Sequence, residues 1–231
     1  MDTGATGGKT GNSGNSSVTG PLLGSRRVRL EPVSAQHVPF LHALASNPLN
    51  GFRWQHGGNV PPLEVFEANL WHGVLAQHVV VHQSDDRLVG HCLLYNPEIN
   101  HGHVSFGAIV TPDMEGSGIG AEASFLSWRL AFKLWNLRKI YLDLPEFNVE
   151  SIAGGVGAFL HEEARLRDHL YYDGRWWDRV TLTVYRADVE ALEHRFGSLL
   201  GDGARTGAKG GTDAAPAHAG TSNGVSSTPL A

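Results

Sequence analysis

A glycine-rich segment between a strand-like and a helix-like stretch most strongly limits what this 231-residue chain can fold into. The segment is Thr111–Gly120, with glycines at 116, 118 and 120. Residues 103–110 before it alternate as a strand does, and residues 121–134 after it carry apolar side chains at helical spacing. Such glycines let backbone amides approach an anion, and the helix N-terminus adds partial positive charge. The segment therefore predicts a phosphate-binding loop or, as the plainer alternative, an ordinary turn.

Two common phosphate-loop patterns do not fit this segment. A P-loop needs a Lys followed by Ser or Thr after its last glycine, whereas Gly120 is followed by Ala121-Glu122. A dinucleotide fingerprint needs a parallel βαβ unit with an acidic residue about 20 residues further on. Asp143 lies near that spacing, but the short connections before residue 103 predict an antiparallel meander instead. We therefore discount both patterns.

The order of predicted elements indicates an α/β protein of the α+β type. The expected elements are a strand over 27–33, helices after Ser34 and Pro61-Pro62, strands over 78–83, 88–95 and 103–110, the long helix, a strand over 140–144, a helix from 148, a hairpin of 166–172 with 176–186, and a closing helix over 187–196. Asp173-Gly174 is the two-residue turn of that hairpin. Val65, Phe66, Leu70, Trp71, Trp128 and Leu134 are among the expected core positions.

Composition limits the domain and its partners. Residues 1–25 and 201–231 are rich in Gly, Ser, Thr and Ala, and all six Trp lie between 54 and 177. We expect one domain over 26–200 between two disordered tails. A net charge of −5 argues against a nucleic-acid partner, and no apolar run approaches the ~18 residues of a membrane helix. With a single cysteine and no visible secretory signal, we expect a cytoplasmic protein without a disulfide framework.

Three motifs in order resemble the GNAT family of N-acetyltransferases over roughly residues 26–188. The first places Glu115, Gly118, Gly120 and Glu122-Ala123 on the family's loop pattern. The second is Asn148-x-x-Ser151, and the third is Asp173-Gly174-Arg175-Trp176-Trp177-Asp178 in the closing hairpin. The resemblance looks greatest to the branch that contains the ribosomal-protein N-terminal acetyltransferases.

The resemblance implies a fold, a substrate and a set of binding residues. The GNAT fold has a mixed, mostly antiparallel sheet of six to seven strands, splayed between strands 4 and 5 and flanked by helices. The acyl donor would be acetyl-CoA, the acceptor a primary amine of a peptide N-terminus or small molecule, and transfer would occur by direct attack. The residues implied in donor binding are Ala108, Ile109 and Val110 for the pantetheine arm, Glu115, Gly116, Ser117, Gly118, Ile119, Gly120 and Ala121 for the pyrophosphate, and Asn148.

The chain departs from the family pattern at the proton-handling positions. Ser105 stands where many relatives carry a Glu, and no Tyr follows the helix Asn at the usual distance. Glycines at 154, 155 and 157 predict a broken or mobile helix. Ser151 is then a candidate acid or an ordinary first-turn serine. These departures keep two alternatives open: a CoA-binding protein without transferase activity, and a transferase of another acyl group such as succinyl.

Histidines and aromatic residues supply the remaining candidates. His103 and His169 could replace the missing base, or be surface or core residues. Arg53, Trp54, Ser105 and Tyr171 are candidate acceptor-side residues, with loop packing as the alternative for Trp54. His91 and Cys92 are expected to be structural. The histidines are scattered along the chain rather than grouped as a ligand set, so we expect no metal site, and a monomer or homodimer.

Overall fold

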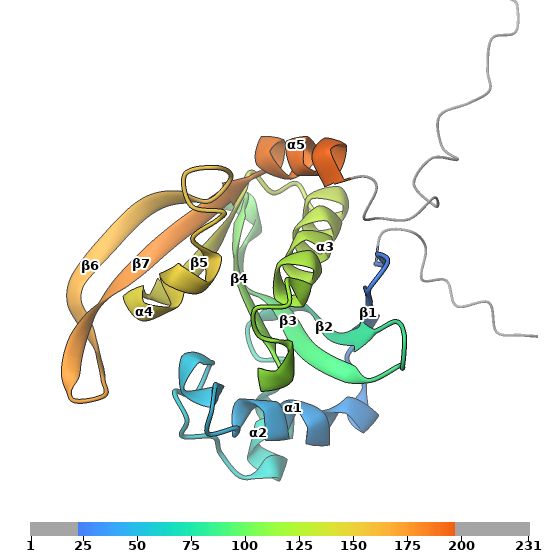
Figure 1. Ribbon diagram of the computed structural model, residues 1–231, viewed down its shortest axis with the longest axis vertical. Helices are drawn as coiled ribbons and strands as arrows, with labels where there is room; N and C mark the ends of the chain where they lie inside the picture. Colours follow the sequence, from blue (N-terminus) through green and yellow to red (C-terminus); the bar gives the residue numbers. More distant parts are fainter. Residues whose placement is uncertain (1–22, 197–231) are drawn as a thin grey trace, which may run out of the picture.

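The structure is a computed structural model that describes residues 23–196, and its centre is one seven-stranded sheet of order β1-β2-β3-β4-β5-β7-β6 (Figure 1). The strands are β1 Val28–Pro32, β2 Val74–His82, β3 Leu88–Glu98, β4 His103–Val110, β5 Lys139–Pro145, β6 His161–Tyr172 and β7 Arg175–Tyr185. The helices are α1 Val38–Ala45, α2 Leu63–Asn69, α3 Ile119–Leu134, α4 Glu146–Val149 and α5 Arg186–Phe196. The predicted fold class is confirmed. The predicted tails, apart from residues 23–25, lie outside the described residues.

The sheet is antiparallel except where β4 meets β5. That parallel pairing is short: it joins His103 to Lys139, Val104 to Ile140 and Ser105 to Tyr141. Beyond Ser105 the two strands separate, and Figure 1 shows β5, β7, β6 and α4 swinging away from the other strands. The predicted splay between the fourth and fifth strands is therefore present, and it begins after Ser105.

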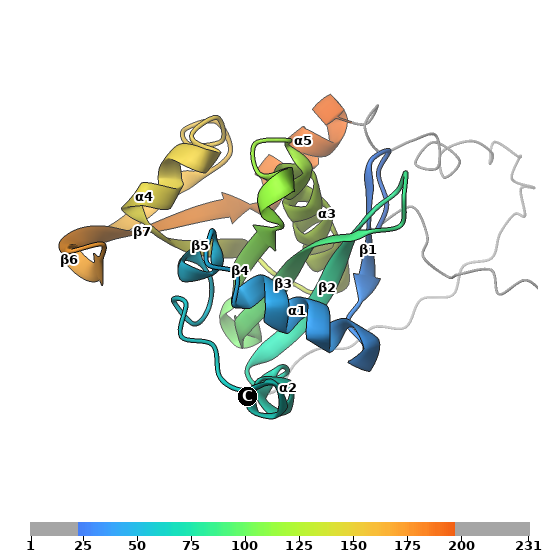
Figure 2. The same ribbon diagram turned by 60° about the horizontal axis from the view of Figure 1, so that its bottom comes forward.

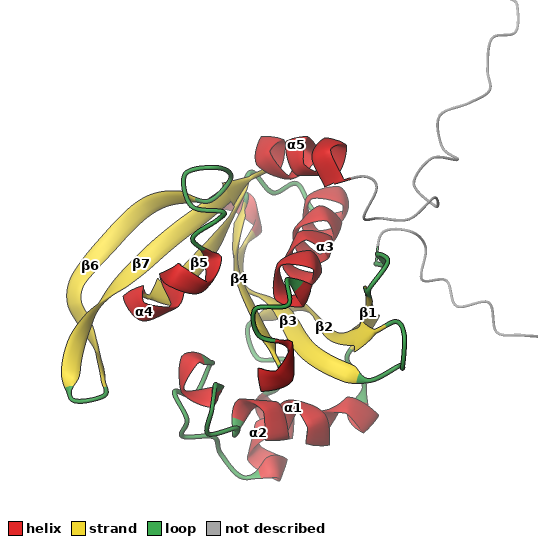
Figure 3. Cartoon of the chain, in the orientation of Figure 1, coloured by secondary structure: helices red, strands yellow, loops and turns green. Residues whose placement is uncertain are grey.

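Helices cover both faces of the sheet (Figures 2 and 3). The larger core lies under α3, whose Leu126 and Ala131 are fully buried against Val104 and Ile140. The smaller core joins α1 and α2 to β2 through residues such as Phe66. Helices α1 and α2 on one face and α3 on the other thus bury apolar side chains against the sheet.

Three predicted core positions are wrong. Leu134 is 59% exposed because it is the last residue of α3, where the helix leaves the sheet. Trp71 is 52% exposed because α2 ends before it, at Asn69. Val65 is 48% exposed because α2 turns only Phe66 toward the sheet. Trp128, by contrast, is buried as expected.

The hairpin of β6 and β7 turns where the sequence predicts. Asp173 and Gly174 have φ angles of +52° and +75°, the left-handed pair that a two-residue hairpin turn requires. Strand β6 is longer than predicted, beginning at His161 rather than at residue 166. It is an edge strand exposed along most of its length, so its early part lacks the apolar alternation by which strands are recognised.

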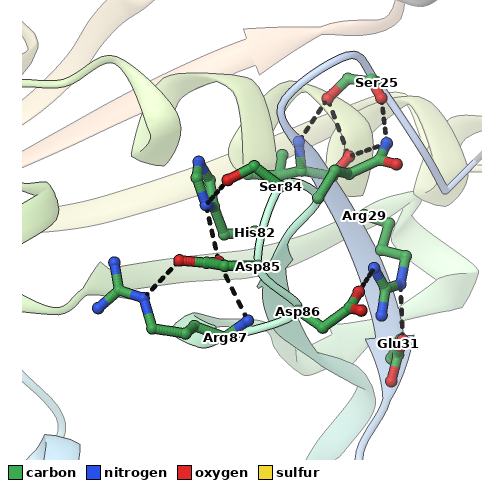
Figure 4. A network of polar contacts seen from close by, with 10 residues as sticks. Ser25, Arg29, Glu31, His82, Ser84, Asp85, Asp86 and Arg87 are labelled. Atoms are coloured by element: carbon green, nitrogen blue, oxygen red, sulfur yellow. Dashed lines mark hydrogen bonds and ion pairs between the residues drawn. The ribbon is translucent and has the colours of Figure 1, made fainter.

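Polar contacts fix the edge of the sheet where β1 meets the β2–β3 turn (Figure 4). Arg29 on β1 binds both Glu31 and Asp86, each at 2.7 Å. His82 and Arg87 both contact the carboxylate of Asp85 in the turn. These groups lie at the surface of the protein, so the pairs add little to stability and mainly set the shape of the turn.

Candidate active site

Beyond Ser105, the separation of β4 and β5 leaves a gap between the two strands. The edge of β4 that faces this gap offers unpaired backbone groups. Thr111 N–H donates to the Val89 carbonyl at 2.9 Å, which makes Val110 and Gly90 a non-hydrogen-bonded pair. Because such pairs alternate along an antiparallel ladder, the N–H and C=O of Ala108 and Val110 point away from β3 and toward the gap. Those of Ile109 point to β3. Of the three residues expected to line the gap with their backbones, two do so.

A buried asparagine that the sequence analysis missed occupies one of these groups. Asn50 is 2% exposed, and its Nδ2 donates to the Val110 carbonyl at 2.7 Å. This bond ties the loop after α1 to the end of β4. The Ala108 N–H and C=O and the Val110 N–H remain directed at the gap.

The glycine-rich loop forms the N-terminus of α3. Gly118 is the N-cap residue with φ of +81°, a conformation that L-residues rarely adopt. The first intrahelical bond runs from Glu122 N–H to the Gly118 carbonyl. The amide groups of Gly120 and Ala121 therefore lie outside the helical ladder, as in the first turn of any helix. This is the anion-binding arrangement predicted from the glycines.

An arginine that is far from this loop in the sequence, just before β1, holds the loop in place. Arg27 donates through Nη1 to the Ser117 carbonyl at 2.8 Å and contacts Glu122 Oε2 at 2.6 Å. The Glu122 side chain is only 7% exposed, so Arg27 supplies the charge that compensates a carboxylate removed from water. Glu115 is an exposed residue of the loop.

Asn148 and Ser151 differ in how their side chains are satisfied. Within the described residues, Asn148 Oδ1 is buried and has no hydrogen-bond partner. Such an orphan is costly without a ligand, which suits the donor-binding role expected of Asn148. Ser151 lies in the turn Glu150–Ile152, and its hydroxyl donates to the Asn148 carbonyl at 2.6 Å. That contact is what an ordinary first-turn serine makes.

The helix after β5 ends early, as the glycines predict. Helical turns stop at Ile152, and Gly157 has φ of +77°. A Cβ on Gly155 would lie 2.8 Å from the Phe159 ring, so this position needs glycine. A chain reversal therefore replaces the helical turn on which relatives place their Tyr.

Trp54 lies over the sheet beside the gap. A Cβ on Gly107 would come within 3.1 Å of its ring, so the glycine makes room for the indole. The ring also meets His91 edge to face, with centroids 5.8 Å apart. Alternation places Ser105 and Gly107 on this face and Phe106 on the α3 face. Trp54 is thus a packing anchor, and its acceptor-side role stays a prediction.

Aromatic rings connect the loop near Trp54 to the hairpin across the gap. Phe52 stacks on Tyr172 with centroids 4.4 Å apart, and Phe147 contacts both rings. Tyr172 rather than Tyr171 makes this connection; Tyr171 is 63% exposed and contacts Trp176. Arg53 is exposed, with its guanidinium 5.1 Å from the Phe52 ring centroid.

The two candidate histidines lie at different places. His103 is at the paired end of β4, against Tyr141, with centroids 5.3 Å apart. His169 is exposed on β6, within an irregular stretch next to Asp168, whose φ is +48°. The structure therefore does not bring them together, and β7 separates the strand of His169 from β5. Both remain predictions as bases.

Two buried groups of β3 are structural. Burial raises the pKa of the Cys92 thiol to about 12, so it is not a thiolate nucleophile at neutral pH. Burial, with a smaller contribution from His78, lowers the pKa of His91 to about 3, and its Nε2 pairs with Gln77 Oε1 at 3.0 Å. Across residues 23–196, no three His, Cys, Asp or Glu side chains are grouped as metal ligands. In the same range no helix is long and apolar enough to cross a membrane.

Comparison with family models decides what this site belongs to. Residues 27–153 match the model described as an acetyltransferase (GNAT) domain, which is more than half of the chain. The chain belongs to the GNAT acetyltransferase family. It is therefore a transferase that moves the acetyl group of acetyl-CoA to a primary amine.

Spermidine N-acetyltransferases are among the relatives of this chain. The spermidine N(1)-acetyltransferase of Escherichia coli strain K12 is 24% identical over 176 residues, covering 73% of this chain and 90% of that protein. The counterpart from strain O157:H7 gives the same values. The crystal structure of the Vibrio cholerae spermidine N-acetyltransferase with CoA and spermine is 19% identical, with TM-score 0.61, covering 71% of this chain and 98% of that one. These matches correct the predicted placement among ribosomal-protein N-terminal acetyltransferases.

The residues present fit the acyl donor. The free amides of the α3 N-terminus suit a pyrophosphate, and the gap-facing groups of Ala108 and Val110 suit an amide-containing arm. We expect the Ala108 N–H, which points to the gap, to meet the oxyanion that develops during transfer. Two polar residues near the gap were given no site role by the sequence analysis: Asn50, which binds the Val110 carbonyl, and Asp143 on β5, which pairs with Arg179. Neither carries a local sequence signal, since both act through contacts far along the chain.

Proposed function

We propose that the acceptor of this GNAT acetyltransferase is a polyamine of the spermidine and spermine class. The support is that the similarity to spermidine N-acetyltransferases spans 90% of the curated chain and 98% of the solved one. A polyamine is a flexible polycation with primary amines at its ends. It meets the one chemical requirement of the family reaction, an amine that can be deprotonated and attack a thioester.

The acceptor side of the gap has suitable chemistry for such a substrate. Trp54 offers an aromatic face, to which ammonium groups bind by cation–π attraction. Asp143 offers a carboxylate on the same face of the sheet, and the net charge of −5 favours approach of a cation. Arg53, which directly precedes Trp54 in the sequence, is an exposed cation, and its guanidinium lies over the Phe52 ring.

Thiol release from acetyl-CoA across matched acceptors tests the proposal. The panel contains spermidine, spermine and putrescine, peptides with free N-termini and blocked lysines, and an aminoglycoside, with product masses measured. We expect kcat/KM to be highest for spermidine or spermine. The matched control is Gly118→Glu, which forces a side chain onto φ of +81° and sets a carboxylate at the phosphate loop, and which should abolish release with every acceptor.

Three outcomes would contradict the proposed reaction, in its acceptor, its acyl donor or its turnover. A higher kcat/KM for an N-terminal peptide would return the protein to the branch predicted from its sequence. Release from succinyl-CoA but not from acetyl-CoA would identify another acyl donor. Binding of acetyl-CoA without release by any amine would indicate that Ser105 and the missing Tyr leave the site without catalysis.

A further inference from the structure

Asp143 lies on β5 at the point where β5 has just separated from β4. The last parallel pair is Ser105 with Tyr141, and two residues further along each strand are Gly107 and Asp143. Because side chains alternate in period two, Asp143 projects to the same face of the sheet as Ser105. That is the face on which Trp54 covers Gly107. Asp143 and Trp54 therefore lie on opposite sides of the gap, Asp143 on β5 and Trp54 over β4. Both are on the face of the sheet where we expect the acceptor to bind.

The carboxylate of Asp143 is held by two partners on the neighbouring strand. The Thr181 hydroxyl donates to Oδ1 at 2.6 Å, and Arg179 Nη2 contacts Oδ2 at 3.2 Å. An ionised carboxylate accepts about four hydrogen bonds, so these contacts leave lone pairs available. The Asp143 side chain is 23% exposed, which leaves it reachable from the gap. The two partners fix the orientation of the carboxylate before any substrate arrives.

Tyr95 completes the surroundings of this carboxylate. It pairs with Ser105 from β3, so it lies on the same face as Asp143. Burial raises the pKa of Tyr95, the charge of Asp143 raises it further, and Arg179 partly offsets both. Tyr95 is therefore neutral at pH 7 and within the electrostatic field of Asp143. The position between them on β4 carries only the small, uncharged Ser105.

We propose that Asp143 binds the primary ammonium group of the acceptor at the mouth of the gap and holds its nitrogen near the thioester, which the nitrogen attacks after a proton has passed to solvent water. A carboxylate–ammonium contact is a charge-assisted hydrogen bond, among the strongest that a half-buried site makes. Thr181 and Arg179 are positioning residues that keep the carboxylate aimed. The inference applies to any primary amine, and so does not depend on the acceptor being a polyamine.

Steady-state kinetics of Asp143→Asn test this assignment. The amide keeps the size of the side chain but loses the charge. We expect the KM for a protonated alkylamine to rise about tenfold or more, with the KM for acetyl-CoA unchanged. The matched control is Glu163→Gln on β6, whose carboxylate binds Lys139 at 2.7 Å where β4 and β5 still pair. This control should leave both KM values unchanged.

An amine of low basicity separates binding of the ammonium from a structural role. Trifluoroethylamine is far less protonated than an alkylamine at neutral pH, so it needs a counter-ion less. We expect Asp143→Asn to impair the alkylamine much more than trifluoroethylamine. Equal loss with both amines, or an unchanged amine KM, would overturn the proposal. A preserved KM for acetyl-CoA shows that the variant is folded. If the wild-type protein prefers peptides, the polyamine proposal fails, but the test of Asp143 still stands because it needs only a primary amine.

Discussion

Acidification should destabilise this protein through two buried histidines of the central sheet. Burial lowers the pKa of His78 to about 4 and that of His91 to about 3, while an unfolded histidine titrates near 6.5. Both are neutral in the folded protein and gain protons only on unfolding as the pH falls below 6.5. Their contribution to stability is therefore complete above that pH and is lost as the pH falls toward the folded values.

The size of this loss follows from the two pKa values. Between pH 7 and pH 5 the unfolded histidine gains most of a proton and the folded one gains almost none. Linkage then gives about 2 kcal/mol for each of His78 and His91, or roughly 4 kcal/mol together. Because a domain of this kind is stabilised by about 5–15 kcal/mol in total, such a loss is readily measured.

Urea unfolding at the two pH values, on wild type and His91→Gln, measures the effect. The glutamine can still donate to Gln77, but it cannot titrate. We expect the variant to be less stable than wild type at pH 7, because its packing against Trp54 is altered. Its free energy of unfolding should nevertheless fall by about 2 kcal/mol less between pH 7 and pH 5. An identical fall in both proteins would refute the argument that His91 stays neutral.

Three substitutions test the other contacts of the site. Arg27→Ala leaves the buried Glu122 carboxylate unpaired, so we expect the free energy of unfolding in urea to fall by about 2 kcal/mol. The KM for acetyl-CoA should rise as well, and an unchanged KM would mean that Arg27 does not hold the loop. Asn148→Ala should raise the KM for acetyl-CoA about three- to tenfold with little change in melting temperature, since Oδ1 has no partner in the described part of the chain. Gly107→Val should displace Trp54 and raise the KM for the amine, and a loss confined to acetyl-CoA binding would contradict the position given to Trp54.

Local features of the sequence determined those elements that depend on the backbone preferences of one or two residues. Asp173-Gly174 adopts left-handed angles that few other residue pairs tolerate, so the hairpin turn was predictable. Gly118 likewise marks the start of α3 because its φ of +81° favours glycine. Where such local cues are weak, the predictions were wrong: β6 was expected to begin too late, and Leu134 at the end of α3 was expected to be buried.

Contacts between distant segments decided the candidate site. Arg27 reaches a carboxylate 95 residues away, and Asn50 reaches Val110 across 60 residues. The place where β4 and β5 part depends on the parallel pairing that ends at Ser105, which no local pattern encodes. Asp143 reads as an ordinary strand residue in the sequence, and only the register of the sheet brings it level with Gly107. The sequence thus supplied the loop and the family, whereas tertiary packing set the acceptor side, because side-chain direction there depends on which strands meet and in what register.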